Sequence, residues 1–208
     1  MTSYTRQVRS LIALIVPMLM LCSGCAFGHR VVALNYRPGA LASNDGNAQA
    51  VHVSAIQDVC PNNEVTVFAQ GREIGEIRNG WYVKTACVVS QSMDLSPWIT
   101  DALMKELKKH GFEPVLVTSL PPECPLGLSG SLSECYSKMK FFGGQTCTLK
   151  ATFSIRKNGA TVSTKQYTAQ HNGGLGLGLT AGDYEKIFQA AMADLMTKIV
   201  ADVVASSQ

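Results

Sequence analysis

Two cysteines near the N-terminus are the residues of this 208-residue chain whose surroundings point most directly to a chemistry. Cys22 and Cys25 follow an apolar run from Leu11 to Leu21, and that run follows a segment carrying Arg6 and Arg9 but no acid. Cations, a short apolar run and then small residues are the order found in a signal peptide. About a dozen apolar residues are too few to cross a bilayer, which takes roughly 20. The sequence therefore predicts that this segment is removed.

The residues before Cys25 predict which thiol is used. Ser23 and Gly24 are small and are followed directly by Cys25. This order looks like a bacterial lipobox, in which the signal peptidase cuts before a cysteine that first receives a diacylglyceryl thioether and later an acyl group on its amine. The residue before Cys22 is a leucine, too bulky for the position that Gly24 fills. We expect residues 1–24 to be the signal peptide and Cys25 to be lipidated; the alternative is a free thiol in an ordinary signal peptide.

The predicted anchor gives the protein an expected location and changes its charge. Ala26 follows Cys25, whereas an aspartate there tends to hold such proteins at the inner membrane, so we expect the periplasmic face of the outer membrane. Residues 1–24 contain two of the 18 Lys and Arg and none of the 15 Asp and Glu. The mature chain is thus close to neutral, and we expect no nucleic-acid partner. We expect residues 25–49 to form a lipidated tether and residues 50–208 a single domain.

A glycine-rich stretch, Gly176 to Ala181, formally matches the dinucleotide-binding fingerprint. That fingerprint requires a second parallel strand after the following helix, and this chain ends about where the helix does. No Gly-Lys-Ser or Gly-Lys-Thr follows, so a phosphate loop is excluded too. We expect a mobile loop in which Thr180 and Asp183 cap the last helix.

The remaining candidates for catalysis or metal binding do not assemble by spacing. The four histidines are expected on different elements: His29, His52, His110 and His171. After Cys25 the nearest pair of cysteines is too far apart for a zinc motif. Asp101 and Glu106 do not share a helix face and are expected to be solvated. The sequence therefore predicts no catalytic residue, no metal site and no cofactor.

Hydrophobic periodicity predicts the elements of the domain. Alternating or strand-rich segments occur at 31–36, 51–55, 65–67, 81–89, 114–117, 146–155 and 161–169. One helix is expected from Ser96 to about His110, and a longer one-sided helix from Asp183 to about Val204. Strands in two groups, each ending in a helix, predict an α+β fold, a single mostly antiparallel sheet with two long helices packed on one face.

One long run, IGEIRNGWYVKTACVVSQSMDLSPWITDALMKELKKHGFEPV, resembles the central signature of the YajG-type bacterial outer-membrane lipoproteins. The matching residues are Ile74, Gly75, Arg78, Asn79, Gly80, Asp94, Trp98, Gly111 and Phe112. The opening LNYRP and the closing strand and helix are similar as well, whereas the connection from Ser119 to Gly144 and the glycines of 173–178 depart from the family. The resemblance implies an envelope lipoprotein with a compact domain and no established reaction.

The connection from Ser119 to Gly144 is the strongest candidate for a contact with a partner. Loops of this length are usually functional or disordered, and this one is rich in apolar and aromatic residues. Tyr136, Phe141 and Phe142 are the expected anchors of the contact. The alternative is that these apolar residues cover the core under a short helix near 131–140.

The same connection carries the candidate disulfide. Cys124 and Cys135 would share one loop in an oxidising periplasm, where exposed cysteines tend to pair. Closing such a loop would stabilise the domain by up to roughly 3 kcal/mol.

Together these observations predict a lipid-anchored, non-catalytic binding or accessory module of the cell envelope. Its partner would be an envelope protein, glycan or lipid, held near the outer membrane by the acyl chains of Cys25. The alternatives are a structural tether in an envelope complex and an envelope hydrolase with an unrecognised site.

Overall fold

The computed structural model describes residues 28–39, 48–61, 71–79, 81–140, 143–174 and 179–208. The strands have the following bounds: β1 Arg30–Val32, β2 Ala50–Ser54, β3 Gln57–Asp58, β4 Arg72–Arg78, β5 Lys84–Ser90, β6 Glu113–Val117, β7 Leu126–Lys140, β8 Gly144–Lys157 and β9 Ala160–Asn172. Helix α2 spans Ser96–Lys109 and helix α3 spans Ala181–Ser207. Neither helix is both long and apolar enough to cross a membrane.

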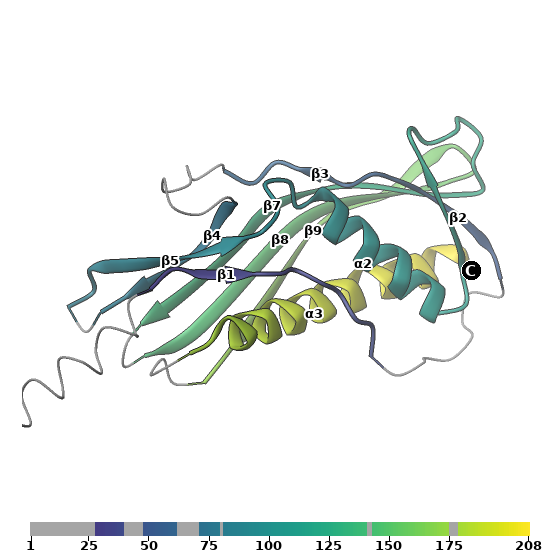
Figure 1. Ribbon diagram of the computed structural model, residues 1–208. Coiled ribbons are helices and arrows are strands. Elements are labelled where there is room, and N and C mark those ends of the chain that lie inside the picture. The colour runs from purple at the N-terminus through teal and green to yellow at the C-terminus, as the bar shows by residue number, and fades with distance from the viewer. Residues whose placement is uncertain (1–27, 40–47, 62–70, 80, 141–142, 175–178) are drawn as a thin grey trace, which may run out of the picture.

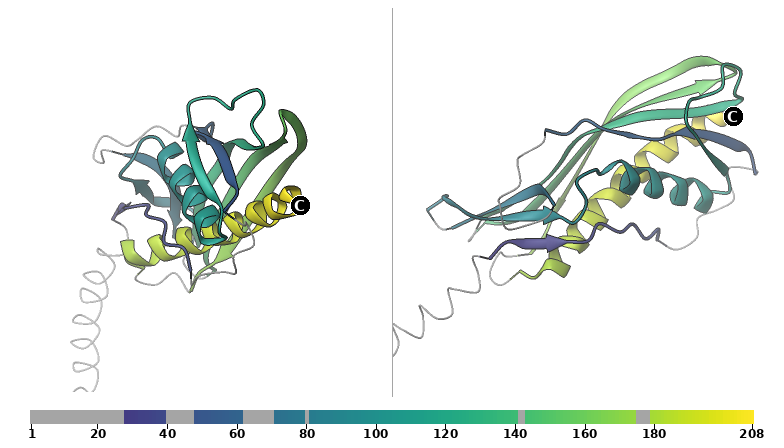
Figure 2. Two further views of the ribbon diagram at one scale, coloured as in Figure 1. Left: turned by 90° about the vertical axis from the view of Figure 1, so that its right-hand side faces the viewer. Right: turned by 45° about the horizontal axis from the view of Figure 1, so that its top comes forward.

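The strands form one mixed sheet of nine strands, with the path β1-β5-β4-β7-β2-β6 and with β8 between β7 and β9. Its longest ladders, β7 with β8 and β8 with β9, are antiparallel, whereas the parallel ladders are short. Both helices lie on the same face of the sheet (Figures 1 and 2). The predicted α+β class, a mostly antiparallel sheet with two helices on one face, is confirmed.

Helix α3 packs along β8 and β9 and also contacts α2, so the core lies between the helices and the sheet. The residues predicted to face the core are all buried: Ile99, Ala102, Leu103 and Leu107 on α2, and Tyr184, Ile187, Ala191, Leu195, Ile199 and Val203 on α3. The predicted cap of α3 is also present, because Thr180 and Asp183 form a capping box. Gly111, at φ +82°, follows α2 as expected.

The prediction of a long loop from Ser119 to Gly144 is wrong. Its greater part, Leu126–Lys140, is the 15-residue strand β7 at the centre of the sheet. One edge of β7 pairs with β8. The other edge pairs with β2, then β3, then β4, at successive positions along the strand. The helix proposed near 131–140 is wrong for the same reason, although the apolar side chains do belong to the core: Leu126, Leu128, Leu132 and Met139.

An irregularity in β7 hides its pattern from the sequence. The ladder with β8 shifts register between Leu132 and Glu134. Before the shift the buried residues fall on even positions, as at Leu128, and after it on odd positions, as at Cys135 and Met139. A β-bulge reverses which face each residue takes, so strict alternation fails over the strand as a whole.

The N-terminal segment is part of the domain. Strand β1 pairs in parallel with β5, with Arg30 opposite Val88. Farther on, the buried Tyr36 hydroxyl donates a hydrogen bond of 2.7 Å to Glu106 Oε2. A strand was expected near 31–36, and the structure shows a shorter one, Arg30–Val32. The chain beyond that strand is held to the domain by the Tyr36 side-chain contact.

Candidate binding groove beside helix α2

A groove of about 450 Å³ lies where the N-terminal segment passes the start of α2. One wall is the segment 33–35, and the other is the connection between β5 and α2. Two exposed carboxylates, Asp94 and Asp101, stand at the groove together with three apolar residues, the partly exposed Leu34 and the buried Leu95 and Trp98. The remaining lining residues are Ala33, Asn35, Ser90, Gln91, Ser92 and Pro97.

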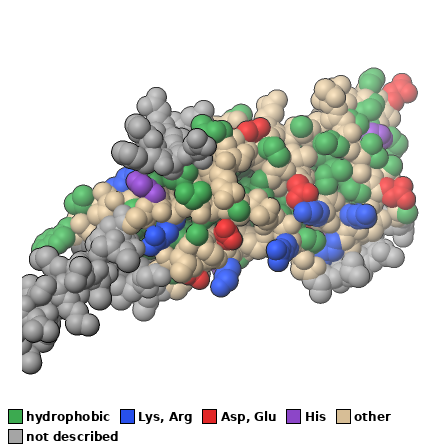
Figure 3. All heavy atoms as spheres, in the orientation of Figure 1, with side chains coloured by type: hydrophobic (Ala, Val, Ile, Leu, Met, Phe, Trp, Pro, Cys, Tyr) green, Lys and Arg blue, Asp and Glu red, His purple; other side chains and the backbone are tan. Residues whose placement is uncertain are grey.

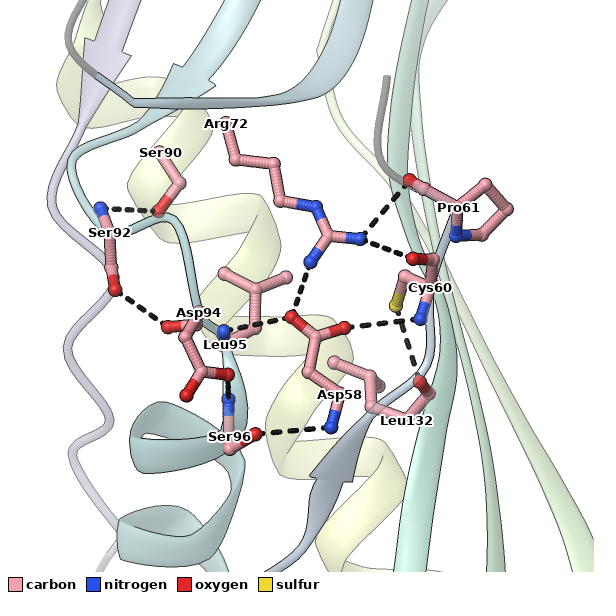
Figure 4. Close-up of polar contacts among 10 residues, drawn as sticks. All are labelled: Asp58, Cys60, Pro61, Arg72, Ser90, Ser92, Asp94, Leu95, Ser96 and Leu132. Carbon is pink, nitrogen blue, oxygen red and sulfur yellow. Dashed lines mark hydrogen bonds and ion pairs between the residues drawn. The ribbon is translucent and has the colours of Figure 1, made fainter. Parts of the chain in front are cut away.

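The β5–α2 wall is held by an ion pair between Asp58 and Arg72 (Figure 4). Both side chains are almost fully buried, with exposed fractions of 6% and 4%. Asp58 Oδ2 also accepts a hydrogen bond of 2.9 Å from the backbone N–H of Leu95. Since Leu95 immediately precedes α2, the Asp58 carboxylate lies at the positive end of the helix dipole and ties the end of β3 to the groove wall.

The other polar atoms of this ion pair are satisfied. Arg72 donates to the carbonyl oxygens of Cys60 and Pro61 at 2.8 and 3.1 Å. Asp58 Oδ1 accepts from the Cys60 N–H at 3.1 Å, and the Asp58 N–H donates to Ser96 Oγ at 3.1 Å. A buried ion pair is tolerated when its remaining donors and acceptors are bonded, as they are here.

Asp94 lies just before α2, whose N-cap residue is Leu95. Its Oδ1 accepts a hydrogen bond of 2.8 Å from the Ser96 N–H. Hydrogen bonds from Ser96 hold the pKa of Asp94 below its usual range, so this carboxylate is ionised at neutral pH. Pro97 follows at the beginning of the helix, where its missing N–H costs nothing. The groove thus has a fixed negative charge at its α2 end.

The opposite wall is fixed by a buried carboxylate, Glu106, which is only 1% exposed. It accepts from Tyr36 and pairs with Lys109 Nζ at 2.6 Å. Burial, and then the hydrogen bond and charge of Glu106, raise the pKa of the Tyr36 hydroxyl, which therefore stays protonated as a donor. The expectation that Glu106 is solvated is wrong; Asp101, paired with Lys105 at 2.7 Å, is exposed as expected.

Two further bonds hold this wall against its neighbours. The Ala33 N–H donates to Glu185 Oε1 on α3 at 3.1 Å, and the Gln91 N–H donates to the Val32 carbonyl at 3.1 Å. The two walls are therefore joined to each other and to α3, which makes the groove a preformed feature of the fold.

One donor at the groove is unsatisfied. Trp98 is 7% exposed and its ring packs edge-on against Phe188, with ring centroids 6.4 Å apart. Its indole N–H has no hydrogen-bond acceptor in the described part of the chain. Buried donors without a partner are rare. This N–H has almost no accessible surface, so it is enclosed beside the groove and is not open to it.

Of the residues predicted as partner contacts, Tyr136 is the one that the structure describes, and it does not line this groove. Tyr136 lies on β7, half-buried, and its hydroxyl donates to Glu73 Oε1 at 3.2 Å. Burial, with the nearby charges of Glu76 and Glu73, raises the pKa of Tyr136. Phe141 and Phe142, like Cys25, lie outside the described residues.

The predicted disulfide does not form in this structure. Cys124 and Cys135 are both buried free thiols. Cys124 Sγ lies against Gly127 at the start of β7, and Cys135 is eight residues farther along the strand, so at about 3.3 Å per residue the two are roughly 25 Å apart. A disulfide requires Cα atoms within about 7 Å. The prediction failed because it assumed a loop where the chain is an extended strand.

The described ranges contain no group of three or more histidine, cysteine or acidic side chains arranged to hold a metal ion. The sequence analysis did not predict that the side chains of Asp58, Arg72 and Glu106 are buried charges. Arg72 and Glu73 open strand β4, whose sequence REIGEIR lacks regular alternation, and the acid that pairs with Arg72 lies on β3, 14 residues earlier. Nothing local to either residue indicates that they pair.

Comparison with known proteins supports the fold. No protein-family model matches the chain, and no curated protein matches it. Among solved structures, protein XCC0632 from Xanthomonas campestris, of family DUF330, has a TM-score of 0.56 at 9% identity, covering 86% of this chain and 96% of its own. An uncharacterized protein has a TM-score of 0.50 at 8% identity, covering 84% and 99%. These likenesses show a shared fold.

A fainter likeness is to a minor lipoprotein from Acinetobacter baumannii, with a TM-score of 0.41 at 11% identity over 76% of this chain and 94% of the other. A structural likeness this weak supports no conclusion about this chain. The resemblance to the YajG-type lipoproteins therefore stays a prediction from the sequence.

Proposed function

We propose that this protein is a lipoprotein of the bacterial outer membrane, acylated at Cys25, whose domain binds an envelope partner at the periplasmic face without catalysing a reaction. The lipobox-like Ser23-Gly24-Cys25 supports the anchor. The groove beside α2 supports the binding role, and it replaces the 119–144 connection as the contact site.

The observation that carries this proposal is the short distance between Cys25 and the folded domain. Strand β1 begins at Arg30 and pairs with β5, so only residues 26–29 separate it from the acylated cysteine. A fully extended link of this length reaches at most about 18 Å. The domain would therefore be held against the bilayer, and its groove would meet partners there at a high effective concentration.

The groove favours a partner segment with hydrogen-bond donors or a positive charge. Asp94 is exposed there and supplies a fixed negative charge. Leu34, which is partly exposed, offers apolar contact in the same groove. An envelope protein, a glycan or a lipid headgroup could present this combination, and a role as structural tether would use the same contact within a larger complex.

Photo-crosslinking in cells tests the proposal. A photoreactive amino acid at position 35 or 92, both exposed at the groove, should give an adduct with an envelope component. The matched control is position 162, an exposed residue on β9 outside the groove, which should give none. Equal adducts from all three positions, or adducts from position 162 alone, would contradict a binding role for the groove.

The anchor is checked in the same cells. Mass spectrometry of the mature protein should find acyl chains on Cys25 as the first residue. A Cys25→Ser chain should lose both the acyl mass and most of the groove adduct, because the local concentration at the membrane is lost. Persistent acylation of that variant would refute the assignment of Cys25.

A further inference from the structure

The hairpin between β4 and β5 ends in three exposed apolar residues. Trp81, Tyr82 and Val83 have exposed fractions of 86%, 64% and 58%. Hydrophobic side chains are visible at the end of the molecule where this hairpin projects, away from the C-terminus (Figures 1 and 3). A group of apolar residues this exposed is unusual on the surface of a water-soluble domain, and it indicates a site of contact with another surface.

The turn that presents these residues is built by Asn79. Its side-chain oxygen accepts from the N–H groups of Trp81 and Val83, at 2.9 and 3.0 Å. Its backbone pairs with both Val83 and Tyr82. Tyr82 takes φ +61°, a left-handed conformation that is costly for an aromatic residue. The turn thus holds the apolar side chains outward at an energetic cost.

Cations surround the apolar tip. Lys140 Nζ lies 5.9 Å from the centre of the Tyr82 ring, and Arg78 donates to the Tyr82 carbonyl at 3.2 Å. Arg78 and Lys84 are paired with Glu76 and Glu73. Lys138 and Lys140 make no ion pair with any described residue, which leaves a positive surface beside the tip. Aromatic residues flanked by lysines are the side chains that favour the boundary between lipid headgroups and acyl chains.

The tip lies at the end of the domain from which the chain leads to the predicted acyl anchor. Because β1 and β5 run parallel and Arg30 lies opposite Val88, the residues just before β1 lie on the side of Val88 that faces the tip. His29 Nδ1 accepts from the Cys87 N–H at 3.2 Å, which fixes residue 29 beside Cys87. From there, Val83 is four strand residues away, about 13 Å, and Cys25 is four residues away, at most about 14 Å.

From this arrangement we infer that the β4–β5 tip is a second membrane contact, in which Trp81, Tyr82 and Val83 enter the headgroup region of the same bilayer that holds the acyl chains of Cys25. The inference rests on the proposed acylation. Its consequence is orientation: an acyl anchor alone leaves the domain free to tilt, whereas two contacts on one end of the molecule hold its long axis away from the membrane.

Tryptophan fluorescence tests this inference, because the chain contains only two tryptophans and Trp98 is buried. The lipidated full-length mature protein is placed in vesicles of equal parts phosphatidylethanolamine and phosphatidylglycerol, with brominated acyl chains as the quencher. The Trp81 emission, taken as the difference between the protein and its Trp81→Phe variant, should shift to shorter wavelength. It should be quenched several-fold by the brominated lipid and protected several-fold from acrylamide.

A Val162→Trp substitution in the Trp81→Phe chain provides the matched control. Val162 is 52% exposed, and β9 places it at the end of the sheet far from the tip. Its emission should respond to acrylamide and not to brominated lipid. Circular dichroism checks that each variant is folded.

The outcomes separate this inference from the anchor. If the protein floats with the vesicles but Trp81 responds to acrylamide and not to brominated lipid, the tip contact is overturned, the anchor stands, and the tip is open to a protein partner. If the protein does not float with the vesicles, both the anchor and the tip contact fail. Equal quenching at positions 81 and 162 would overturn the inference as well, since the contact would not be specific to the tip.

Discussion

Asp58 and Arg72 show how single residues determine the groove. Each is a charged group removed from water. Asp58 is balanced by Arg72 and by the N–H groups of Cys60 and Leu95, and Arg72 is balanced by Asp58 and by the carbonyl oxygens of Cys60 and Pro61. Such a pair adds little net stability, but loss of one partner leaves the other charge buried without compensation. The pair therefore makes the position of the groove wall depend on one contact between β3 and β4.

Asp58→Asn should destabilise the domain by about 3–5 kcal/mol, because Arg72 would keep its charge without a carboxylate. For a domain of this size that corresponds to a fall of roughly 10 °C in Tm or more, measured by circular dichroism. Asp101→Asn is the matched control. Its pair with Lys105 is exposed, so the loss should be below about 1 kcal/mol. Equal losses in the two variants would show that the burial of Asp58 has no energetic role.

At the scale of elements, regular segments were predictable and β7 was not. Strand β8 alternates without interruption, with Cys147, Leu149 and Phe153 buried as its sequence indicates. Helix α3 keeps one apolar face over its whole length. Both patterns are local. In β7 the bulge at Ser133 reverses the alternation, and only pairing with distant strands shows that the segment is extended.

The groove was hidden for a related reason. Asp58 and Arg72, or Tyr36 and Glu106, meet only after the sheet and helices have assembled, and neither partner has a local sequence signal. By contrast, the capping box of α3 was predictable, because Thr180 and Asp183 lie within one turn of each other.

Strand β7 also carries a packing constraint that can be tested. A Cβ at Gly130 would lie 2.6 Å from the Thr152 carbonyl oxygen and 2.8 Å from the Phe153 ring, in the middle of the β7–β8 ladder. Gly130→Ala should therefore cost about 1–3 kcal/mol, measured as a lower urea midpoint. Gly174→Ala, where a Cβ meets nothing within 4 Å, should leave the midpoint almost unchanged. A neutral Gly130→Ala would mean that β8 moves away at little cost.

At the scale of the whole molecule, β5 links the three proposed features. Its first residue follows the β4–β5 tip, its middle lies beside the segment that leads to Cys25, and its last residue, Ser90, lines the groove. The distance along β5 from Val83 to Ser90 is about 23 Å. A domain held at Cys25 and at the tip would present its groove at about this height above the bilayer, facing the periplasm.

Lengthening the link between Cys25 and β1 should release this arrangement. A flexible Gly/Ser insertion of about ten residues after Phe27 adds a root-mean-square reach of roughly 17 Å. The tip would then leave the bilayer for part of the time. A fluorescent amino acid at position 92 should show weaker energy transfer to an acceptor in the membrane, while acylation at Cys25 is unchanged.

The same insertion between residues 43 and 44 is the matched control for length and composition. That position follows β1 in the chain, so an insertion there leaves the path from Cys25 to the β1–β5 ladder unaltered. Energy transfer from position 92 should then equal that of the unmodified protein. If both insertions reduce the transfer equally, the segment after residue 39 contributes to the height of the domain, and the short link before β1 does not set it alone. If neither does, the contact at the tip is strong enough to hold the domain without the constraint of the link.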